Sequence, residues 1–396
     1  MGREKRKIDP FINMSPVDKI LVYCVKDELL GRKKKAIAHF LKEPIDWSNL
    51  VLQSGSHGVN AYVYNTLKKV NGNLVSPDAL QKLRNSYLVE NSKTVNFSVE
   101  LQKILLEFQK REIKNILLKG PFLAEQIYPR SDLRSYTDID ILVQEPDLFQ
   151  AAEVLSNLGY IQTEKNERLY KNEGRTQLLF QKPNSVMIDL HWEVLNNKWY
   201  PNVSKYFAHD IWKNIYPLKL SNSITWAFPR EDLLIYQCIH LAIHHKFHKL
   251  VWFKDVDQIL RSGPIDWATF LTKVKKYRLV THCYYALNLT KILLESPIPE
   301  SILYDLRPRF FMARVFEFFL RRENLLRLSE DKRSQTQQIW RILRDDFWQR
   351  WGAVRWRAFP SIEWYLCYYP FLPRIKEVYY YPLYPFLILL RLVRRP

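Results

Sequence analysis

Two aspartates in the segment TDIDILV have the spacing of a metal site. Asp138 and Asp140 are separated by one residue. Alternate residues of a β-strand point to the same side, so the two carboxylates would lie about 6.6 Å apart along a strand. A third aspartate, Asp189 in MIDLHW, follows 49 positions after Asp140 and also alternates with apolar residues. A neighbouring strand could therefore bring its carboxylate to the same place.

Three neighbouring carboxylates repel one another unless a cation lies between them. Mg²⁺ takes oxygen ligands and keeps positions open for water and for substrate phosphates. Two ions roughly 4 Å apart are the arrangement used for in-line displacement at phosphorus. We therefore expect Asp138, Asp140 and Asp189 to be metal ligands and catalytic residues. The alternative is that they are idle residues at a strand edge, but a D-x-D inside a strand with a third strand aspartate favours an active site.

The segment LLKGPFLAEQIY could bind phosphate groups. Lys119 ends an apolar run, Gly120 permits a tight turn, and Pro121 suits the first position of a helix. Backbone N–H groups at a helix start and the charge of Lys119 both favour phosphate. An ordinary turn with a solvated lysine is the alternative. Two arginines in the following loop, Arg130 and Arg134, have the forked donors that suit a triphosphate, although surface arginines are common in loops.

Histidines form a second group of interest. His240, His244 and His248 recur every four residues, which places them on one face of a helix. Such a set of histidines could bind a zinc ion. The run has no H-E-x-x-H pattern and no carboxylate, so we favour histidines that pack against the catalytic unit or line an acceptor pocket. His191, two residues after Asp189, could orient the site or stack on a base.

The elements that must position these residues can be read from hydrophobic periodicity. Residues 17–100 have helical spacing, with Asp46 as an N-cap, and the chain is helical again from about residue 229. Between them lie a short apolar strand at 116–119, the strand that carries Asp138 and Asp140, and a helix at 146–160. Three further strands are expected from the segments RLYKN, TQLLFQK and SVMIDLHWEV.

One segment is repeated at a constant offset of 220 residues. Ile45-Asp46-Trp47 matches Ile265-Asp266-Trp267, and Tyr64 matches Tyr284. Two related helical units are therefore expected to flank the central unit, although a match this short can also arise by chance.

Composition and charge restrict the partners. The chain has 396 residues, a net charge of +19 and 47% hydrophobic residues, so it can form two or three domains and favours anionic partners. About half of the excess positive charge lies between residues 307 and 396. That region could bind nucleic acid, or it could be a solubilising surface.

The targeting signals and cysteines favour a cytoplasmic protein. The basic start has no apolar region behind it and is not a signal peptide. The apolar run VYYYPLYPFLILLRLV is too short and too rich in proline to span a bilayer, so we expect it to dock on the body rather than lie on a membrane surface through Arg391, Arg394 and Arg395. Four widely spaced cysteines suggest neither zinc nor disulfides.

These motifs together resemble a known family. KGPFLAEQIYP, TDIDILV, NLGY, IDLHWEV, HLAIHH and LVWFKDVDQIL are similar to the uncharacterised nucleotidyltransferase family of bacteria, over about residues 45–295. This family belongs to the DNA polymerase β-like superfamily. The resemblance implies an α+β fold in which a small mixed-sheet nucleotidyltransferase core is flanked by helical domains. It also implies transfer of an NMP from an NTP such as ATP to an acceptor hydroxyl, with release of pyrophosphate.

The resemblance assigns roles to individual residues. Asp138 and Asp140 would bind both Mg²⁺ ions, and Asp189 would bind the catalytic ion and help to deprotonate the acceptor. Gly120 would begin the helix that faces the triphosphate. The superfamily usually has Gly-Ser or Gly-Gly at this turn, whereas this chain has Gly120-Pro121, so Lys119 would replace the missing hydroxyl contact.

The full expectation is a four-part enzyme. We expect an N-terminal helical region (1–97), the nucleotidyltransferase core (98–225), a helical domain (226–305) and a basic aromatic helical region (306–396). Nucleotide contacts are expected from Lys119, Gly120 and Arg134, and an acceptor pocket from His191, His240 and His244. A small molecule or a peptide is favoured as acceptor over RNA because no RNA-binding module is recognisable. The alternative function is a non-catalytic protein that binds nucleic acid or a membrane surface through its basic C-terminal region.

Overall fold

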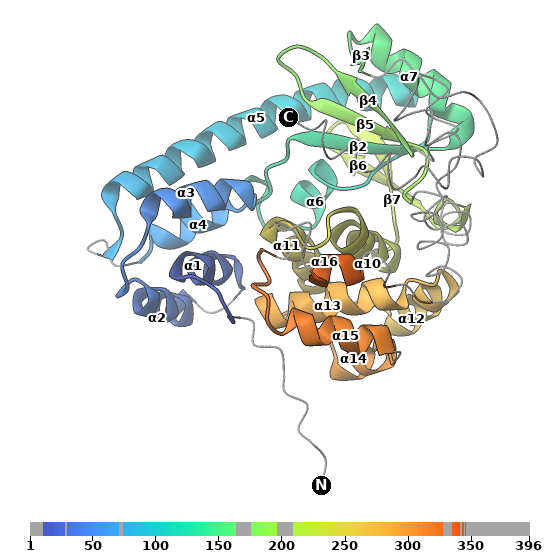
Figure 1. Cartoon of the computed structure of the whole chain (residues 1–396). Helices are drawn as coiled ribbons and strands as arrows, with labels where there is room; N and C mark the ends of the chain where they lie inside the picture. Colours follow the sequence, from blue (N-terminus) through green and yellow to red (C-terminus); the bar gives the residue numbers. More distant parts are fainter. Residues whose placement is uncertain are drawn as a thin grey trace, which may run out of the picture.

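The chain forms a mixed β-sheet with helices around it, which confirms the expected α+β class (Figure 1). The computed structural model describes residues 11–27, 30–70, 74–163, 176–195, 209–309, 311–327, 335–340, 343 and 345. Within these residues no helix is long and apolar enough to cross a membrane. The basic, aromatic C-terminal region lies mostly outside them, as does the apolar run near its end.

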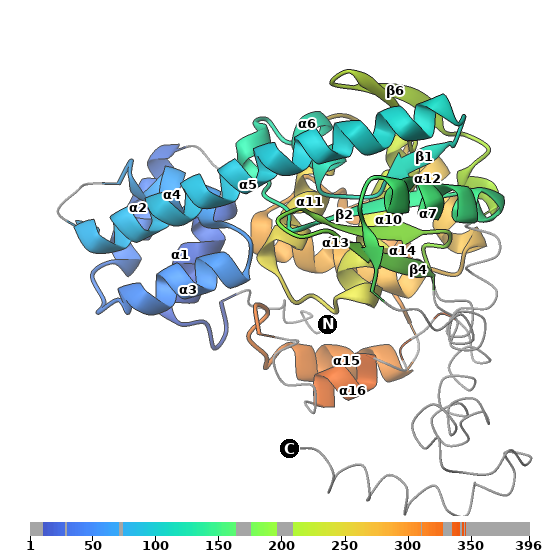
Figure 2. The same cartoon turned by 90° about the horizontal axis from the view of Figure 1, so that it is seen from above.

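Five helices precede the sheet. They are α1 (Pro16–Val25), α2 (Leu30–Phe40), α3 (Trp47–Ser56), α4 (Asn60–Leu67) and α5 (Pro77–Lys110). Figures 1 and 2 show α1–α4 gathered at one end of α5, whose other end runs along the sheet. The division of the chain into four regions stays a prediction, and α5 passes residue 97 as one unbroken helix.

Within the described residues the sheet has seven strands, in the order β3-β4-β5-β2-β1-β7-β6. They are β1 (Asn115–Leu117), β2 (Asp138–Val143), β3 (Ile161–Gln162), β4 (Gln177–Gln181), β5 (Met187–His191), β6 (Tyr216–Leu220) and β7 (Ser223–Ala227). Strand β2 pairs antiparallel with β1 and parallel with β5, so it is a central strand. The predicted strands at 116–119, 136–143, 176–182 and 185–194 are confirmed as β1, β2, β4 and β5, while RLYKN lies outside the described residues.

Strands β6 and β7 were not predicted. They form a hairpin joined by two residues, Ser221 and Asn222, and Ser221 has a φ of 51°. Positive φ in a two-residue loop is typical of the turns that match strand twist. Gln102 of α5 holds this hairpin, because its side-chain N–H donates to the Leu220 carbonyl at 3.1 Å.

Short helices connect the strands of the core. They are α6 (Pro121–Gln126), η2 (Ser131–Leu133), η3 (Glu145–Asp147) and α7 (Leu148–Asn157). The helix predicted at 146–160 is therefore present, but Pro146 lies in a separate 3₁₀ turn before it. Proline has no backbone N–H group. It is tolerated at a helix start because the N–H groups of the first turn have no partner within the helix.

Helices also follow the sheet, as predicted. They are α10 (Arg230–Ile239), the π-helical turn η4 (His240–His244), α11 (Leu250–Arg261), α12 (Trp267–Lys276), α13 (Val280–Leu294), α14 (Glu300–Leu306), α15 (Phe311–Leu320) and α16 (Gln335–Trp340). Cys24, Cys238 and Cys283 are buried and free.

The repeated segment has the same local structure in both copies. Asp46 caps α3 and Asp266 caps α12, with φ and ψ of −75° and 91° in the first and −74° and 91° in the second. The turns that follow each contain a left-handed residue at the same offset of 220, Gly58 with φ 67° and Arg278 with φ 55°. The pairs α3–α4 and α12–α13 are thus two copies of one helix–turn–helix unit.

Candidate active site

The two aspartate strands are aligned in register. In the parallel pairing of β2 with β5, Asp140 is the direct partner of Asp189. Side chains of paired residues lie on the same face of a sheet, so the two carboxylates meet. Asp138 lies two residues earlier on β2, at the start of the strand, and is half-buried. Asp140 is only 4% exposed, so both faces of β2 are covered and the carboxylate lies inside the protein.

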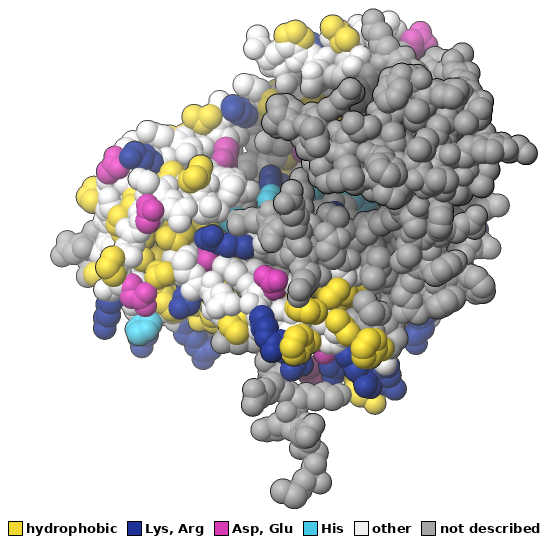
Figure 3. All heavy atoms as spheres, in the orientation of Figure 1, with side chains coloured by type: hydrophobic (Ala, Val, Ile, Leu, Met, Phe, Trp, Pro, Cys, Tyr) yellow, Lys and Arg dark blue, Asp and Glu magenta, His cyan; other side chains and the backbone are white. Residues whose placement is uncertain are grey.

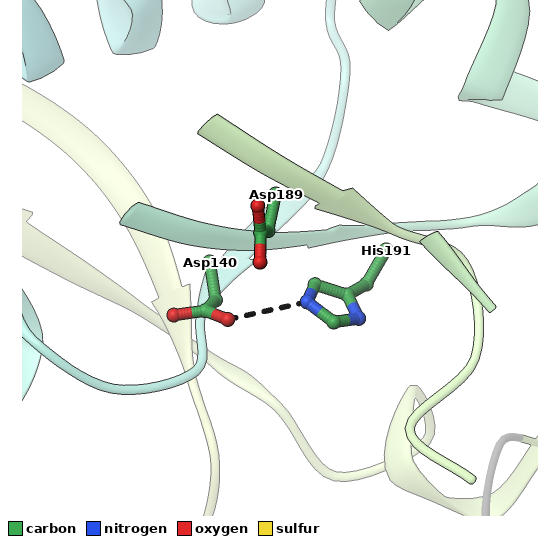
Figure 4. A group of neighbouring side chains, drawn as sticks. All are labelled: Asp140, Asp189 and His191. Carbon is green, nitrogen blue, oxygen red and sulfur yellow. Dashed lines mark hydrogen bonds and ion pairs between the residues drawn. The ribbon is translucent and has the colours of Figure 1, made fainter. Parts of the chain in front are cut away.

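His191 completes a cluster with these two aspartates. Asp140, Asp189 and His191 each place a ligand atom within 4.8 Å of the others. Figure 4 shows Asp189 and His191 projecting from one strand toward Asp140 on its neighbour. His191 Nε2 lies 3.3 Å from Asp140 Oδ1, and the Gln177 side-chain N–H donates to Asp189 Oδ2 at 3.3 Å. His191, which was expected near the acceptor, therefore contacts Asp140, one of the expected metal ligands.

Asp138 contacts Lys119 instead of this cluster. Lys119 Nζ lies 3.1 Å from Asp138 Oδ2 and 3.1 Å from Asp140 Oδ2, so one ammonium bridges both carboxylates. The Lys119 side chain is 12% exposed. The sequence placed Lys119 at the phosphate groups, and the structure places its charge at the carboxylates.

The surroundings shift the pKa values of Asp140 and Asp189 in opposite directions. Burial alone would raise the pKa of Asp140, but the charge of Lys119 and the hydrogen bond from His191 outweigh it and lower the pKa to about 2. Burial raises the pKa of Asp189 to about 6, and repulsion from Asp140 adds to the effect. Asp140 is therefore a permanent anion, whereas Asp189 changes charge near neutral pH.

The turn after Lys119 requires glycine. Gly120 has a φ of 55° and a ψ of −107°, a combination that side chains with a Cβ atom disfavour. A Cβ atom there would also lie 3.3 Å from Tyr136 Cβ. Helix α6 begins at the next residue but has only six residues, so its dipole is small. Gly120 thus shapes the chain between β1 and α6.

Arg134 forms a buried ion pair. Its Nε lies 2.7 Å from Asp255 Oδ1 and its Nη2 lies 2.9 Å from Asp255 Oδ2, while the Tyr128 hydroxyl donates to the same carboxylate at 2.7 Å. Burial alone would lower the pKa of Arg134, but the Asp255 carboxylate raises it. Arg134 therefore connects the loop before β2 to helix α11. The other loop arginine, Arg130, pairs with Asp132 at the surface.

A cavity of about 980 Å³ opens onto Lys119 and Asp138. Its wall also includes α5 and the segment that precedes and begins α11. Six of the lining residues have basic or imidazole side chains, namely Lys93, Lys119, Arg134, His245, His248 and Lys249. Burial lowers the pKa of His245 to about 3, so this imidazole is neutral. Trp252 lines the same wall and stacks on His245, with ring centroids 3.7 Å apart. The carboxylate cluster therefore adjoins a space that is large enough for a nucleotide and in which basic residues outnumber acidic ones.

The π-helical turn η4 changes which histidines face this cavity. The His245 N–H donates to the His240 carbonyl at 3.1 Å, five residues back, so the turn holds one more residue than an α-helical turn. His240 is buried, and neither of its ring nitrogens has a partner in the described part of the chain. His244 Nε2 donates to the Val194 carbonyl at 2.9 Å. His245 and His248 line the cavity in their place.

Sequence reasoning also missed Lys93 and Lys249 as cavity residues. Lys93 belongs to α5, far earlier in the chain, and Lys249 precedes α11. Neither lies in a motif with recognisable spacing. Only the folded arrangement of α5 against the core brings them together.

The match to known proteins agrees with this geometry. A family model described as an uncharacterised nucleotidyltransferase matches residues 43–295, which covers more than half of the chain and includes the whole carboxylate cluster. No curated protein matches the chain. The chain belongs to this family, and it is a nucleotidyltransferase.

Proposed function

We propose that this member of the nucleotidyltransferase family transfers an NMP from an NTP such as ATP to an acceptor hydroxyl and releases pyrophosphate. The observation that carries the proposal is the register of β2 and β5, which makes Asp140 and Asp189 direct partners beside a cationic cavity. Acidic residues next to a basic cavity are what a metal–triphosphate complex requires.

A divalent metal ion fits the residues present. Asp189 Oδ1 is buried and accepts no hydrogen bond within the described residues, and the cation beside Asp140 Oδ2 there is the Lys119 ammonium at 3.1 Å. Buried carboxylate oxygens without donors are costly unless a cation is bound. Asp138, Asp140 and Asp189 would hold two Mg²⁺ ions, which would neutralise the triphosphate charge and activate the acceptor hydroxyl.

Several residues of the chain would act around this chemistry. His191 contacts Asp140 Oδ1 and would fix the orientation of that carboxylate. Asp189 would accept the proton as the acceptor oxygen attacks the α-phosphorus and the bond to the pyrophosphate oxygen breaks.

The cationic residues of the cavity would bind the NTP. Lys119 and Lys249 line the cavity, and the backbone at Gly120 lines it next to them. Arg134 also lines it, but its Nε and Nη2 donate to Asp255 and its Nη1 donates to the Ser135 carbonyl. We propose that Arg134 shapes the wall and adds positive potential rather than holding a phosphate oxygen by itself.

The acceptor would be a small molecule or a peptide. The volume of about 980 Å³ lies at the upper end of the range of ligand pockets, so it suits a nucleotide with a compact acceptor. His245, His248 and Trp252 would contact the acceptor, because they line the cavity where His240 does not.

A cytoplasmic setting is part of the proposal. Cys24, Cys238 and Cys283 are free thiols. The redox systems of the cytosol keep protein thiols reduced, and NTPs are available in that compartment.

The test is Mg²⁺-dependent pyrophosphate release from each of the four NTPs, with a cell-extract metabolite fraction as acceptor. We expect Asp138→Asn, Asp140→Asn and Asp189→Asn to abolish release. Asp78→Asn, which removes an exposed carboxylate on α5, should not change it. Undiminished release in the Asp140 and Asp189 variants would refute the site.

A further inference from the structure

A second cationic cavity lies between α14 and α15. It has a volume of about 400 Å³ and lies outside the family match, which ends at residue 295. Its charged and aromatic lining consists of Tyr304, Arg307, Arg309, Arg314, Glu317 and Arg321. Four guanidinium groups and one carboxylate therefore surround one small space.

The single carboxylate of this lining is shared by two arginines. Arg307 Nη2 lies 3.0 Å from Glu317 Oε2, and Arg321 Nη2 lies 3.8 Å from the same oxygen. Arg309 and Arg314 have no carboxylate within ion-pair distance in the described part of the chain. The cavity thus keeps an excess of positive charge that its own residues do not neutralise.

One donor in this cluster is buried without an acceptor. Arg321 Nε is inaccessible to solvent, and no described residue accepts its hydrogen. A buried donor of a charged group is costly when it is left unpaired. An anion with several oxygens in the cavity would neutralise the guanidinium groups around it and so reduce the cost of holding Arg321 here.

We propose that this cavity binds a phosphate group of a ligand other than the NTP substrate. Guanidinium groups present planar pairs of donors that match phosphate oxygens. The Arg309 guanidinium carbon lies 5.1 Å from the Tyr304 ring centroid, so one of the four groups is held over an aromatic face at the rim. The site is separate from the carboxylate cluster and does not depend on the proposed reaction.

The phosphate group can come from a soluble metabolite or from a lipid headgroup. Two large apolar side chains of α15 are exposed, Phe311 at 76% and Phe318 at 54%. In Figure 3, hydrophobic and basic side chains lie next to one another over the lower part of the molecule, where Figure 1 places α14 and α15. Such a surface suits the headgroup region of an anionic bilayer, so both sources are tested.

The first experiment is calorimetric titration of the full chain with inorganic phosphate, in EDTA. We expect Arg309→Gln/Arg314→Gln to weaken phosphate binding by about tenfold or more, since two charge-assisted contacts are lost. The matched control is Arg32→Gln/Arg84→Gln, which removes the same charge from exposed positions of α2 and α5. A Lys93→Met/Lys119→Met background removes binding in the larger cavity and should keep the effect. Equal affinity in the wild type and the Arg309/Arg314 variant overturns the proposal.

The second experiment identifies the source of the phosphate. Wild type and both double variants are sedimented with vesicles of phosphatidylglycerol or of phosphatidylcholine. Sedimentation with phosphatidylglycerol alone, lost in the Arg309/Arg314 variant and kept in the control, assigns a lipid headgroup. Sedimentation that is absent or unchanged by the variant, together with the tenfold effect on inorganic phosphate, assigns a soluble ligand. Circular dichroism confirms that the variants are folded.

Discussion

The Lys119 ammonium lies 3.1 Å from Asp140 Oδ2, the carboxylate oxygen that a metal ion would need. The same Nζ lies 3.1 Å from Asp138 Oδ2. A lysine that neutralises two carboxylates competes with any cation for them. Without a metal ion, the ammonium reduces the repulsion among the neighbouring acids. A metal ion bound through Asp140 Oδ2 would have to displace it.

Replacing this lysine should therefore separate metal binding from catalysis. We expect Lys119→Met to bind Mn²⁺, used as a spectroscopic substitute for Mg²⁺, about tenfold or more tightly than the wild type, because a competing charge is lost. NTP affinity and pyrophosphate release should fall. Electron paramagnetic resonance measures the free Mn²⁺.

A matched lysine distinguishes competition from general charge. Lys93→Met removes a charge from the same cavity but from a residue that has no ion pair with the aspartates. Its Mn²⁺ affinity should stay close to that of the wild type. Weaker Mn²⁺ binding in Lys119→Met would mean that the lysine supports the metal site instead of competing for it.

Breaking the ion pair between Arg134 and Asp255 should destabilise the fold. Asp255→Asn leaves a buried guanidinium without a counter-charge, so we expect a loss of about 3–5 kcal/mol in the free energy of unfolding. Asp78→Asn removes one member of the exposed Lys82–Asp78 pair and should change it by less than about 1 kcal/mol. Urea denaturation followed by circular dichroism measures both, and equal effects would contradict the structural role of Asp255.

Two substitutions of glycine by alanine should change the free energy of unfolding in opposite directions. Gly120→Ala forces a Cβ atom into a left-handed turn and against Tyr136, and should cost about 1–3 kcal/mol. Gly31→Ala lies in helix α2 with no atom within 4 Å, and should stabilise by about 0.5–1 kcal/mol. Thermal unfolding compares the two. A neutral effect at Gly120 would show that the turn can relax.

Acid should destabilise the protein through His57. This residue is buried, its Nδ1 accepts the Leu250 N–H at 3.3 Å, and burial lowers its pKa to about 4. The unfolded chain binds the proton near pH 6.5, so the unfolded state carries more protons between pH 6.5 and 4. Stability from this group is complete above pH 6.5 and is lost as the pH falls toward 4, by up to about 1.4 kcal/mol per pH unit.

The comparison that tests the histidine is the pH dependence of urea unfolding in two variants. His57→Asn should show a shallower loss of stability between pH 6.5 and 4 than the wild type. His39→Asn, at an exposed position of α2, should follow the wild type. An unchanged slope in His57→Asn would assign the acid sensitivity to other groups.

The metal-site strands could be predicted because their signal is local. Asp138, Asp140 and Asp189 alternate with apolar residues, and that period places them on strands without knowledge of the fold. The register between the two strands cannot be predicted from this local pattern. The pairing of Asp140 with Asp189 depends on how β5 enters the sheet next to β2. The assignment of these residues to catalysis stays a prediction.

Other parts of the site depend on contacts between distant residues. Arg134 finds its partner 121 positions later, at Asp255, so no spacing rule reveals that its donors are occupied. The histidine run was read with a regular helical period, and the π-turn at His240–His244 shifts that period by one residue. The hairpin of β6 and β7 was missed because its strands have only five residues each and β6 contains Pro217, which argues against a strand.

Helix α5 has a mechanical consequence. Its 34 residues span about 50 Å as one rod, and Glu90, Lys93 and Phe97 of its middle section form part of the cavity wall. The helices α1–α4 are carried at one end of this rod, while its other end is fixed to the β6–β7 hairpin by Gln102. The α1–α4 end is also joined to the helices after the sheet, because Asp27 pairs with Lys254 of α11 and Lys26 pairs with Glu295 at the end of α13. A displacement of α1–α4 would therefore be transmitted to two walls of the cavity at once, through α5 and through α11.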